Sequence, residues 1–250
     1  MKKLIIVLSH QRTGSSLLMQ TLKHLNVGII GEFERSDLPQ KANPNGYYED
    51  VDILSKGLTK KAIEKIEENK SEVVAVKIAM NGMTKDNRLE HWQYLQKKQA
   101  TILATIRPPL ESAVSSLVFN RKNDELTHFK QITTYLRSYC LHYKALSEIL
   151  LSIVPELLPS SFIVNYHMAL KYPQKYVQSI VKRAELIVSK CQFQNAVKNI
   201  DLELYRYNQD SFELNLKKWN RIIGADRIYN ILSTQKNPWE IIIGLERKQS

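Results

Sequence analysis

The chain has 250 residues, of which 43% are hydrophobic and 24% charged, as in ordinary soluble globular proteins. Its 36 Lys and Arg against 25 Asp and Glu give a formal charge of +11, which favours anionic partners without choosing among nucleic acid, an acidic polysaccharide, a membrane surface and a polyphosphorylated cofactor. No apolar run approaches the roughly 20 residues that span a bilayer, and the run at 4–8 is too short for a signal peptide. With only two cysteines, Cys140 and Cys191, we expect reduced thiols in a soluble, cytoplasmic protein.

Short apolar runs rich in β-branched residues predict the strands of a buried parallel sheet. The clearest are LIIVL, VVAVKIA and ATILATI, and two weaker runs follow the same pattern. In chain order the five runs cover residues 4–8, 27–30, 73–79, 100–106 and 161–166. Helical periodicity is found between and after them, at 15–25, 51–69, 86–98, 109–121 and 127–153, and again from about residue 174 onward.

This alternation predicts an α/β fold of three layers, a mostly parallel sheet flanked by helices, with a P-loop-like strand–loop–helix at the N-terminus. We find no repeat, low-complexity tract or linker, so we expect a single domain over residues 1–250 with a helical C-terminal part from about 174. Ligands bind such sheets at the carboxyl ends of the strands. Two polar segments follow strands in this way, SHQRTGSS at 9–16 and RPPLESAVSS at 107–116.

The first of these segments is a tight glycine turn between a strand and a helix. Such a turn leaves backbone N–H groups at the positive end of the helix dipole, where phosphate or sulfate can bind. Gly14 permits the turn, Ser15 and Ser16 offer hydroxyl groups, and Arg12 offers a delocalised cation. The alternative is that Thr13 and the two serines only cap the helix.

The turn lacks two groups that ATP-dependent phosphoryl transfer requires. P-loop enzymes carry a Lys on the β- and γ-phosphates and an acidic residue at a strand end that holds Mg²⁺. Here no Lys follows Gly14, and the strand at 100–106 ends in Arg107. We therefore expect a site that balances anionic charge without a metal.

The two segments together resemble the loops of the sulfotransferases that use 3′-phosphoadenosine 5′-phosphosulfate (PAPS). QRTGSSLL is similar to the family's 5′-phosphosulfate loop, with Gln11 in place of a Pro. The resemblance implies that Arg12 contacts the transferring sulfuryl group. It also implies that the phosphosulfate is cradled by Thr13, Gly14, Ser15 and Ser16.

A second family motif, an Arg followed eight positions later by a Ser, is present in IRPPLESAVSS as Arg107 and Ser115. The resemblance implies that both bind the 3′-phosphate of the donor. The spacing is physically reasonable, because an Arg at a strand end and a hydroxyl two turns into the next helix can converge on one phosphate. Pro108 stands where the family usually has Asp or Asn.

Two further segments extend the resemblance, which spans roughly Lys3 to Pro173. NPNGYYED at 43–50 is similar to a segment of a bacterial branch of the family. SFIVNYHMALKYP at 161–173 is similar to a strand followed by Tyr-Glu-Asp-Leu, with His167 and Met168 in the region of the acidic pair. The Arg-Lys-Gly loop with which cytosolic members bind the 3′-phosphate has no convincing copy.

The resemblance implies transfer of a sulfuryl group from PAPS to a hydroxyl of a glycan, lipid or small molecule, with release of 3′,5′-adenosine bisphosphate. A general base would take the acceptor proton. Glu32, 20 residues after Arg12, resembles the Gly-Glu of tyrosylprotein sulfotransferases, and Glu49 lies in the segment NPNGYYE, so both are candidates. Lys77 resembles a Lys that could touch the sulfuryl group, although an ordinary strand-end cation is the alternative. His10 is a weaker candidate base.

Two other functions fit part of the pattern. A P-loop kinase-like, ATP-dependent phosphotransferase would use the anion loop, and a non-enzymatic module that binds nucleic acid or acidic glycan would use the positive charge. For a sulfotransferase we expect a hydroxyl-bearing acceptor, with an acidic glycan among the candidates, and no nucleic-acid partner. Acceptor specificity is expected in the loop at 33–46 and in the C-terminal helices.

Overall fold

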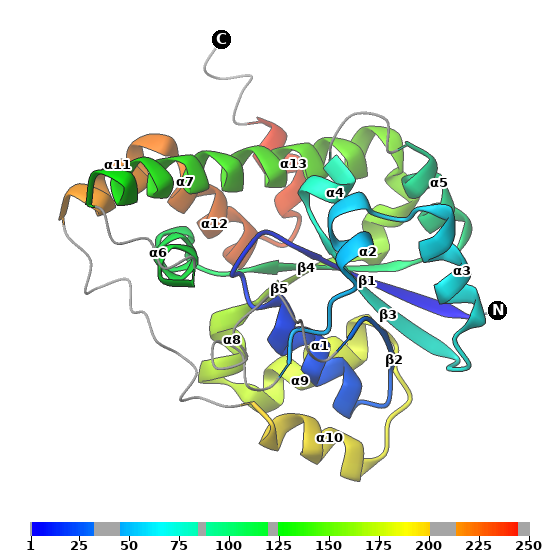
Figure 1. Cartoon of the computed structure of the whole chain (residues 1–250). Helices are drawn as coiled ribbons and strands as arrows, with labels where there is room; N and C mark the ends of the chain where they lie inside the picture. The colour runs from blue at the N-terminus through cyan, green and yellow to red at the C-terminus, as the bar shows by residue number, and fades with distance from the viewer. Residues whose placement is uncertain (1, 33–45, 85–88, 120–124, 201–213, 245–250) are drawn as a thin grey trace.

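The computed structural model of the chain describes residues 2–32, 46–84, 89–119, 125–200 and 214–244. Its centre is a sheet of five parallel strands in the order β2-β3-β1-β4-β5 (Figure 1). The strands are β1 Lys3–Ser9, β2 Gly28–Ile30, β3 Val73–Ala79, β4 Thr101–Ile106 and β5 Ser161–Asn165. All five predicted strands are thus confirmed, with ends that shift by one residue or less.

Strand β1 lies in the middle of the sheet between β3 and β4. Its last residue, Ser9, is paired with Ala79 of β3 and with Thr105 of β4. The carboxyl ends of three strands therefore meet at one edge, on both sides of the strand from which the glycine turn departs. In open parallel sheets this is the usual place for a ligand.

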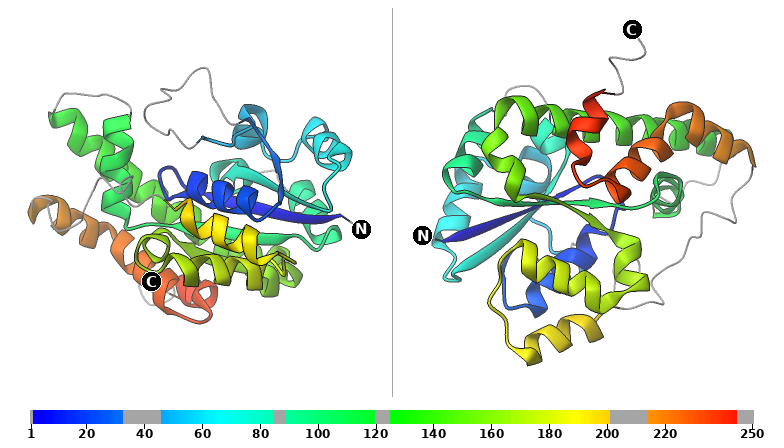
Figure 2. Two further views of the ribbon diagram at one scale, coloured as in Figure 1. Left: turned by 90° about the horizontal axis from the view of Figure 1, so that it is seen from below. Right: turned by 180° about the vertical axis from the view of Figure 1, so that it is seen from behind.

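The apolar run of β1 fills two separate cores. Leu4, Ile6 and Leu8 belong to the core on one face of the sheet, whereas Ile5 and Val7 belong to the core on the other face. Because successive side chains of a strand point to opposite faces, a strand covered on both sides needs an uninterrupted apolar run. The views in Figure 2 show helices on both sides of the sheet, so the predicted three-layer α/β fold is confirmed.

The helices divide between the two faces. The larger core is covered by α2 Val51–Lys56, α3 Lys60–Glu68, α4 Asn81–Thr84, α5 Leu89–Lys97, α6 Pro109–Phe119, α7 Glu125–Glu148, α11 Leu214–Ile223, α12 Ala225–Thr234 and α13 Pro238–Gly244. The other core is covered by α1 Ser15–His24, α8 Tyr166–Lys171, α9 Pro173–Arg183 and α10 Lys190–Lys198. A π-helical turn, Ile149–Ile153, and a 3₁₀ helix, Pro155–Ser160, connect α7 to β5.

The structure differs from the predicted helices mainly at 51–69. That pattern is divided into α2 and α3, because Gly57 ends α2 with a φ of 73° and the Thr59 side chain caps α3. A positive φ at this point favours Gly and stops a right-handed helix. Residues 33–45 lie outside the described residues, and with them most of the loop at 33–46 in which acceptor specificity is expected.

Two observations concern the setting of the protein. Within the described ranges, no helix is both long enough and apolar enough to cross a membrane. Cys140, buried in α7, and Cys191, exposed on α10, are both free. Burial raises the pKa of the Cys140 thiol to about 11, so this thiol is protonated and unreactive at neutral pH.

Candidate active site at the carboxyl end of the sheet

The turn between β1 and α1 has the backbone conformation that an anion site needs. Arg12 and Gly14 both have positive φ, 61° and 96°, and α1 begins directly afterwards at Ser15. A turn of this kind directs successive N–H groups into one concavity at a helix N-terminus. A Cβ atom on Gly14 would lie 2.5 Å from the ring of Tyr166, so glycine is required both by φ and by close packing.

Thr13 faces the interior. Its hydroxyl donates to the carbonyl of His10 at 2.7 Å and lies 2.7 Å from Oγ1 of Thr105 on β4. The side chain is fully buried. Thr13 therefore fixes the turn to the neighbouring strand, and its backbone N–H is the group it can offer to an anion.

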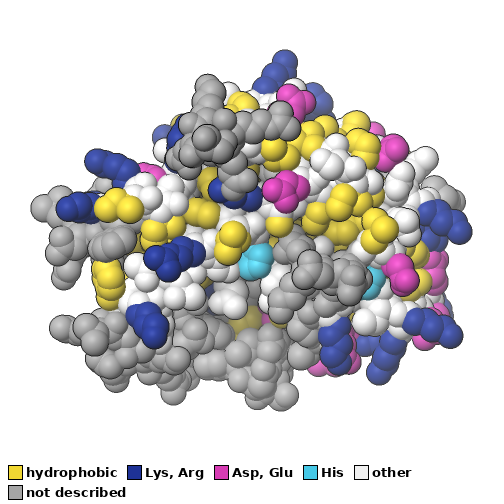
Figure 3. Space-filling view, turned by 90° about the horizontal axis from the view of Figure 1, so that it is seen from above, with side chains coloured by type: hydrophobic (Ala, Val, Ile, Leu, Met, Phe, Trp, Pro, Cys, Tyr) yellow, Lys and Arg dark blue, Asp and Glu magenta, His cyan; other side chains and the backbone are white. Residues whose placement is uncertain are grey.

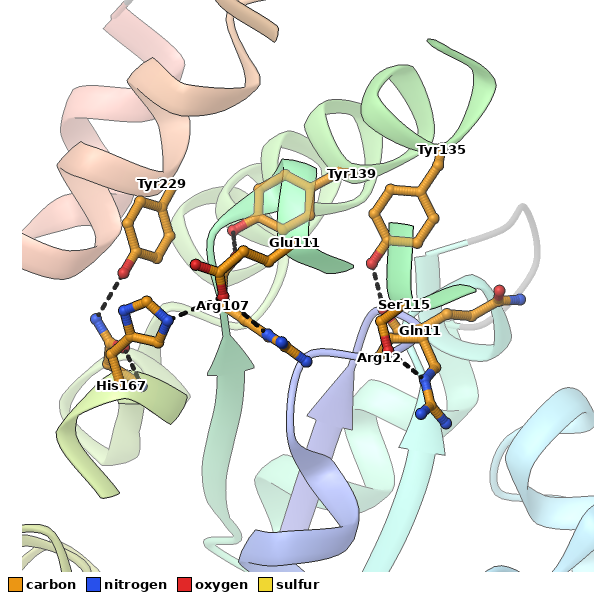
Figure 4. Close-up of polar contacts among 10 residues, drawn as sticks. Gln11, Arg12, Arg107, Glu111, Ser115, Tyr135, Tyr139, His167 and Tyr229 are labelled. Carbon is orange, nitrogen blue, oxygen red and sulfur yellow. Dashed lines mark hydrogen bonds and ion pairs between the residues drawn. The ribbon is translucent and has the colours of Figure 1, made fainter. Parts of the chain in front are cut away.

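The two sequence segments expected to bind phosphate meet directly. Nε of Arg12 donates to Oγ of Ser115 on α6 at 3.1 Å (Figure 4). Arg107 follows β4, and the close-up shows its guanidinium group beside the β1–α1 turn. Its Cζ lies over the Tyr166 ring, 4.8 Å from the ring centre, a cation–π contact. The structure thus brings two arginines and a serine to one edge of the sheet.

Lys77 links the turn to the segment that carries a candidate base. Its side chain is 1% exposed, and Nζ lies 2.7 Å from Oε1 of Glu49 in an ion pair. Nζ also donates to Oγ of Ser16 at 3.1 Å and to the carbonyl of Tyr47 at 2.7 Å. A buried ammonium is tolerated only when it is paired and hydrogen-bonded in this way. Lys77 therefore contacts two other residues that were singled out in the sequence, Glu49 and Ser16.

Both candidate bases lie in one short antiparallel pairing. The N–H of Glu32 donates to the carbonyl of Glu49 at 3.1 Å, and the N–H of Glu49 donates to the carbonyl of Glu32 at 3.2 Å. Glu32 is exposed, whereas Glu49 is half-buried against Lys77. The structure therefore holds the two residues opposite each other in backbone register, but only the Glu49 carboxylate is joined to the anion turn through Lys77.

Three tyrosines on α7 hold the backbone from which the two arginines emerge. Tyr135, Tyr139 and Tyr143 are spaced by four residues and so lie on one side of the helix. Their hydroxyls donate to the carbonyls of Gln11, Arg107 and Thr105 respectively. Burial raises the pKa of all three phenols, which keeps them protonated as donors.

His10 is buried against α7. Its ring is buried, with Nε2 3.1 Å from Oγ of Ser138 and an edge-to-face contact with Tyr135 at 4.5 Å between ring centres. Burial, and next the neighbouring His142, lower its pKa from 6.5 to about 3. A group with so low a pKa is a poor proton acceptor near neutrality, so we assign His10 to packing rather than to proton transfer.

The low pKa of His10 predicts acid-sensitive stability. Below pH 6.5 His10 is protonated in the unfolded chain, whereas in the folded chain it becomes protonated only near pH 3. The free energy of unfolding therefore falls as the pH falls from 6.5 towards 3. Between pH 6.5 and 5 the loss is at most about 2 kcal/mol, at about 1.4 kcal/mol per pH unit. Urea unfolding at pH 7.5 and 5.0 should show this loss in the wild type and a smaller one in His10→Gln. Equal losses in the two proteins would contradict the prediction.

Three further residues lie next to the predicted ones. Glu111 and Tyr166 were not singled out from the sequence, and His167 was named there only as standing in the region of the family's acidic pair. Glu111 accepts a hydrogen bond from Nε of Arg107, Tyr166 packs over Gly14, and His167 contacts Glu111. The sequence could have indicated Glu111, because it stands four positions after Arg107 at the start of a predicted helix, a spacing that favours an ion pair. The other two reach the site only because β5 lies beside β4, which the local pattern did not determine.

Comparison with known proteins gives a match to a solved structure but none to a family model or a curated protein. No protein-family model matches the chain, and no curated protein matches it. The crystal structure of mouse sulfotransferase SULT7A1 complexed with PAP matches with a TM-score of 0.53, over 98% of this chain and 89% of the other, at 12% sequence identity. At this identity the match shows the fold, so the chain has the P-loop-like α/β fold of a sulfotransferase.

Proposed function

We propose that the protein is a sulfotransferase that moves a sulfuryl group from PAPS to an acceptor hydroxyl. The observation that carries this proposal is the hydrogen bond from Arg12 to Ser115. It joins the turn that resembles a 5′-phosphosulfate loop to the helix that resembles a 3′-phosphate site. Arg107 lies at the end of the adjoining strand. Arg12 would therefore bind the 5′-phosphosulfate of a donor nucleotide, and Arg107 would bind its 3′-phosphate.

The residues present fit such a donor. The β1–α1 turn offers backbone N–H groups, the hydroxyls of Ser15 and Ser16 and the guanidinium of Arg12 for the phosphosulfate. Arg107 and Ser115 would hold the 3′-phosphate. The mouse sulfotransferase of the same fold was crystallised with PAP, the 3′,5′-adenosine bisphosphate that such a transfer leaves behind.

Three side chains near the β1–α1 turn, Arg12, Lys77 and Glu49, would act in the transfer of the sulfuryl group. In the transfer the acceptor oxygen bonds to sulfur, the bond from sulfur to the phosphate oxygen breaks, and the acceptor proton must leave. Arg12 would stabilise the charge that develops on the departing oxygen. Lys77 would neutralise the sulfuryl group from the side of Ser16. Glu49 would take the proton, since its ion pair with Lys77 would hold its carboxylate near that group. We keep Glu32 as the second candidate base, since it is paired with Glu49 through the backbone.

The two alternative functions have less support. The turn lacks the Lys of a kinase P-loop, and β4 is followed by Arg107 where a metal-binding acid would be needed. A polyanion-binding surface would gather Lys and Arg into one patch or stripe. On the face drawn in Figure 3, the basic side chains of the described residues lie in several separate groups, some at the outline and some well inside it, with acidic side chains beside several of them.

Ligand-induced thermal stabilisation tests the proposal against both alternatives. PAP should raise the melting temperature, because a ligand at 100 times its Kd stabilises the folded state by about 2.7 kcal/mol, whereas Mg·ATP should raise it much less. The PAP effect should persist at moderate salt, while binding to a polyanion such as heparin should fall steeply with salt. Stabilisation by Mg·ATP but not by PAP would favour the kinase-like function and overturn the proposal.

Several finer points are proposed on the same basis. The segment NPNGYYE is similar to a bacterial branch of the family, and we propose that branch for this chain. We also propose one domain for the whole chain, supported by two cores that share one sheet, and a reducing, cytoplasmic setting, supported by two free thiols. A screen with radiolabelled sulfate donor against glycans, lipids, small alcohols, phenols and tyrosine peptides would identify the acceptor.

A further inference from the structure

A buried carboxylate stands behind Arg107. The side chain of Glu111 is 1% exposed, and Oε2 accepts a hydrogen bond from Nε of Arg107 at 3.2 Å and one from Nε2 of His167 at 3.0 Å. The two donors come from different parts of the chain, Arg107 from the end of β4 and His167 from the first turn of α8 (Figure 4). One oxygen atom therefore joins the arginine to the helix beside it.

The surroundings of Glu111 keep it charged. Burial alone would raise the pKa of this carboxyl, but the hydrogen bond from His167, the charge of His167 when protonated and the charge of Arg107 outweigh burial and lower it. An ionised carboxylate accepts hydrogen bonds and donates none. At neutral pH it thus binds Nε of Arg107 as an acceptor.

The position of His167 is itself fixed. Its backbone N–H donates to Oδ1 of Asn165 at 2.9 Å, and Nδ2 of Asn165 donates to the hydroxyl of Tyr229 at 3.3 Å. These contacts start α8 at the end of β5. Arg107 is held at Nε by Glu111, and its Cζ lies over the Tyr166 ring, so less side-chain freedom remains to be lost when a ligand binds.

We propose that Glu111 and His167 are positioning residues for the 3′-phosphate of the donor nucleotide, acting through Arg107. The inference rests on the proposed function and adds to it a source of nucleotide selectivity. An arginine held at Nε by a carboxylate keeps its planar guanidinium group in a set direction, and this preorganisation suits the group to a phosphate. A nucleotide with a 3′-phosphate then gains affinity, and a nucleotide without one gains none from this arrangement.

Calorimetric titration with PAP and with adenosine 5′-monophosphate tests the inference, because the two ligands differ in the 3′-phosphate. We expect Glu111→Gln to weaken PAP binding by about 10-fold or more, the usual effect of losing a charge-assisted hydrogen bond. Binding of adenosine 5′-monophosphate should stay within about 2-fold, since its phosphate occupies the β1–α1 turn. Glu68→Gln on the exposed side of α3 is the matched control and should change neither affinity.

A pair of His167 variants tests the other donor. His167→Gln keeps a side-chain N–H for Glu111, whereas His167→Phe keeps the bulk and loses the donor. We expect His167→Phe to reduce the preference for PAP over adenosine 5′-monophosphate several-fold and His167→Gln to restore most of it. A purely structural role would weaken both nucleotides together, so the ratio of the two affinities reports positioning. Because the His167 side chain is partly exposed, its two variants should fold, so they test the inference even if Glu111→Gln does not fold.

The possible outcomes separate the two proposals. A wild-type protein that binds PAP no better than adenosine 5′-monophosphate would overturn the proposed function and this inference with it. A clear wild-type preference for PAP that survives unchanged in Glu111→Gln and in His167→Phe would overturn the inference alone. Loss of the preference in both variants, with the preference kept in Glu68→Gln, would support the assignment.

Discussion

Replacement of Arg12 by alanine is expected to lower kcat by about 10²-fold or more, the usual cost of removing one preorganised donor from developing negative charge. The side chain is well placed for this effect, because its backbone has a positive φ of 61° in the anion turn and Nε is 3.1 Å from Oγ of Ser115. The assay is sulfate transfer from radiolabelled donor to the best acceptor from the screen, with PAP affinity measured in parallel. PAP affinity should fall much less than kcat, since PAP lacks the sulfuryl group.

Two controls make the Arg12 result specific. Arg12→Lys keeps the charge without the planar fork and should retain more activity than alanine but less than the wild type. Arg227→Ala removes an exposed arginine on α12 and should leave kcat unchanged. Near-wild-type turnover by Arg12→Ala would remove Arg12 from the catalytic assignment. An equal loss in kcat and in PAP affinity would show that Arg12 contributes to nucleotide binding and not specifically to the transfer step.

Much of the sheet could be predicted because strands buried on both faces need continuous apolar runs. LIIVL and VVAVKIA are such runs, and they form β1 and β3 with little change of bounds. The order of the strands was not predictable in the same way, since nothing local determines that β2 joins β3 rather than β1. The break at Gly57 was also missed, because apolar residues keep helical spacing across it and only its φ of 73° ends the helix.

The candidate site was predictable where a short segment carries its own geometry. Gly14 and Arg12 lie on one turn, and Arg107 and Ser115 lie on one strand end and the next helix. Contacts that depend on tertiary packing could not be predicted, and the approach of Tyr166 to Gly14 is the clearest case. The orientation of Thr13 also escaped the sequence, because a threonine in such a turn can point to the ligand or to the neighbouring strand, and here it bonds across to β4.

Glu49→Gln is expected to lower kcat by about 10²-fold or more, the contribution typical of a general base. Glu32→Gln is expected to stay within about 10-fold of the wild type, because the Glu32 carboxylate is exposed and Glu32 is paired with Glu49 through the backbone. The two variants make the same chemical change at two residues that face each other in one antiparallel pairing. Each therefore serves as the matched control for the other, with sulfate transfer to the best acceptor as the measurement.

The Glu49 variant must be separated from a loss of stability. Removing the charge leaves the buried ammonium of Lys77 without its carboxylate, and breaking a buried ion pair can cost about 3–5 kcal/mol. Urea unfolding and PAP titration of Glu49→Gln should be measured first, and its activity should be assayed where the variant is folded and saturated with donor. Under these conditions a base still shows itself, since the loss should be smaller for an acceptor with a more acidic hydroxyl, which needs less help in releasing its proton. A loss that is independent of acceptor acidity would instead assign Glu49 to holding Lys77 in place, and a larger loss in Glu32→Gln would move the base to Glu32.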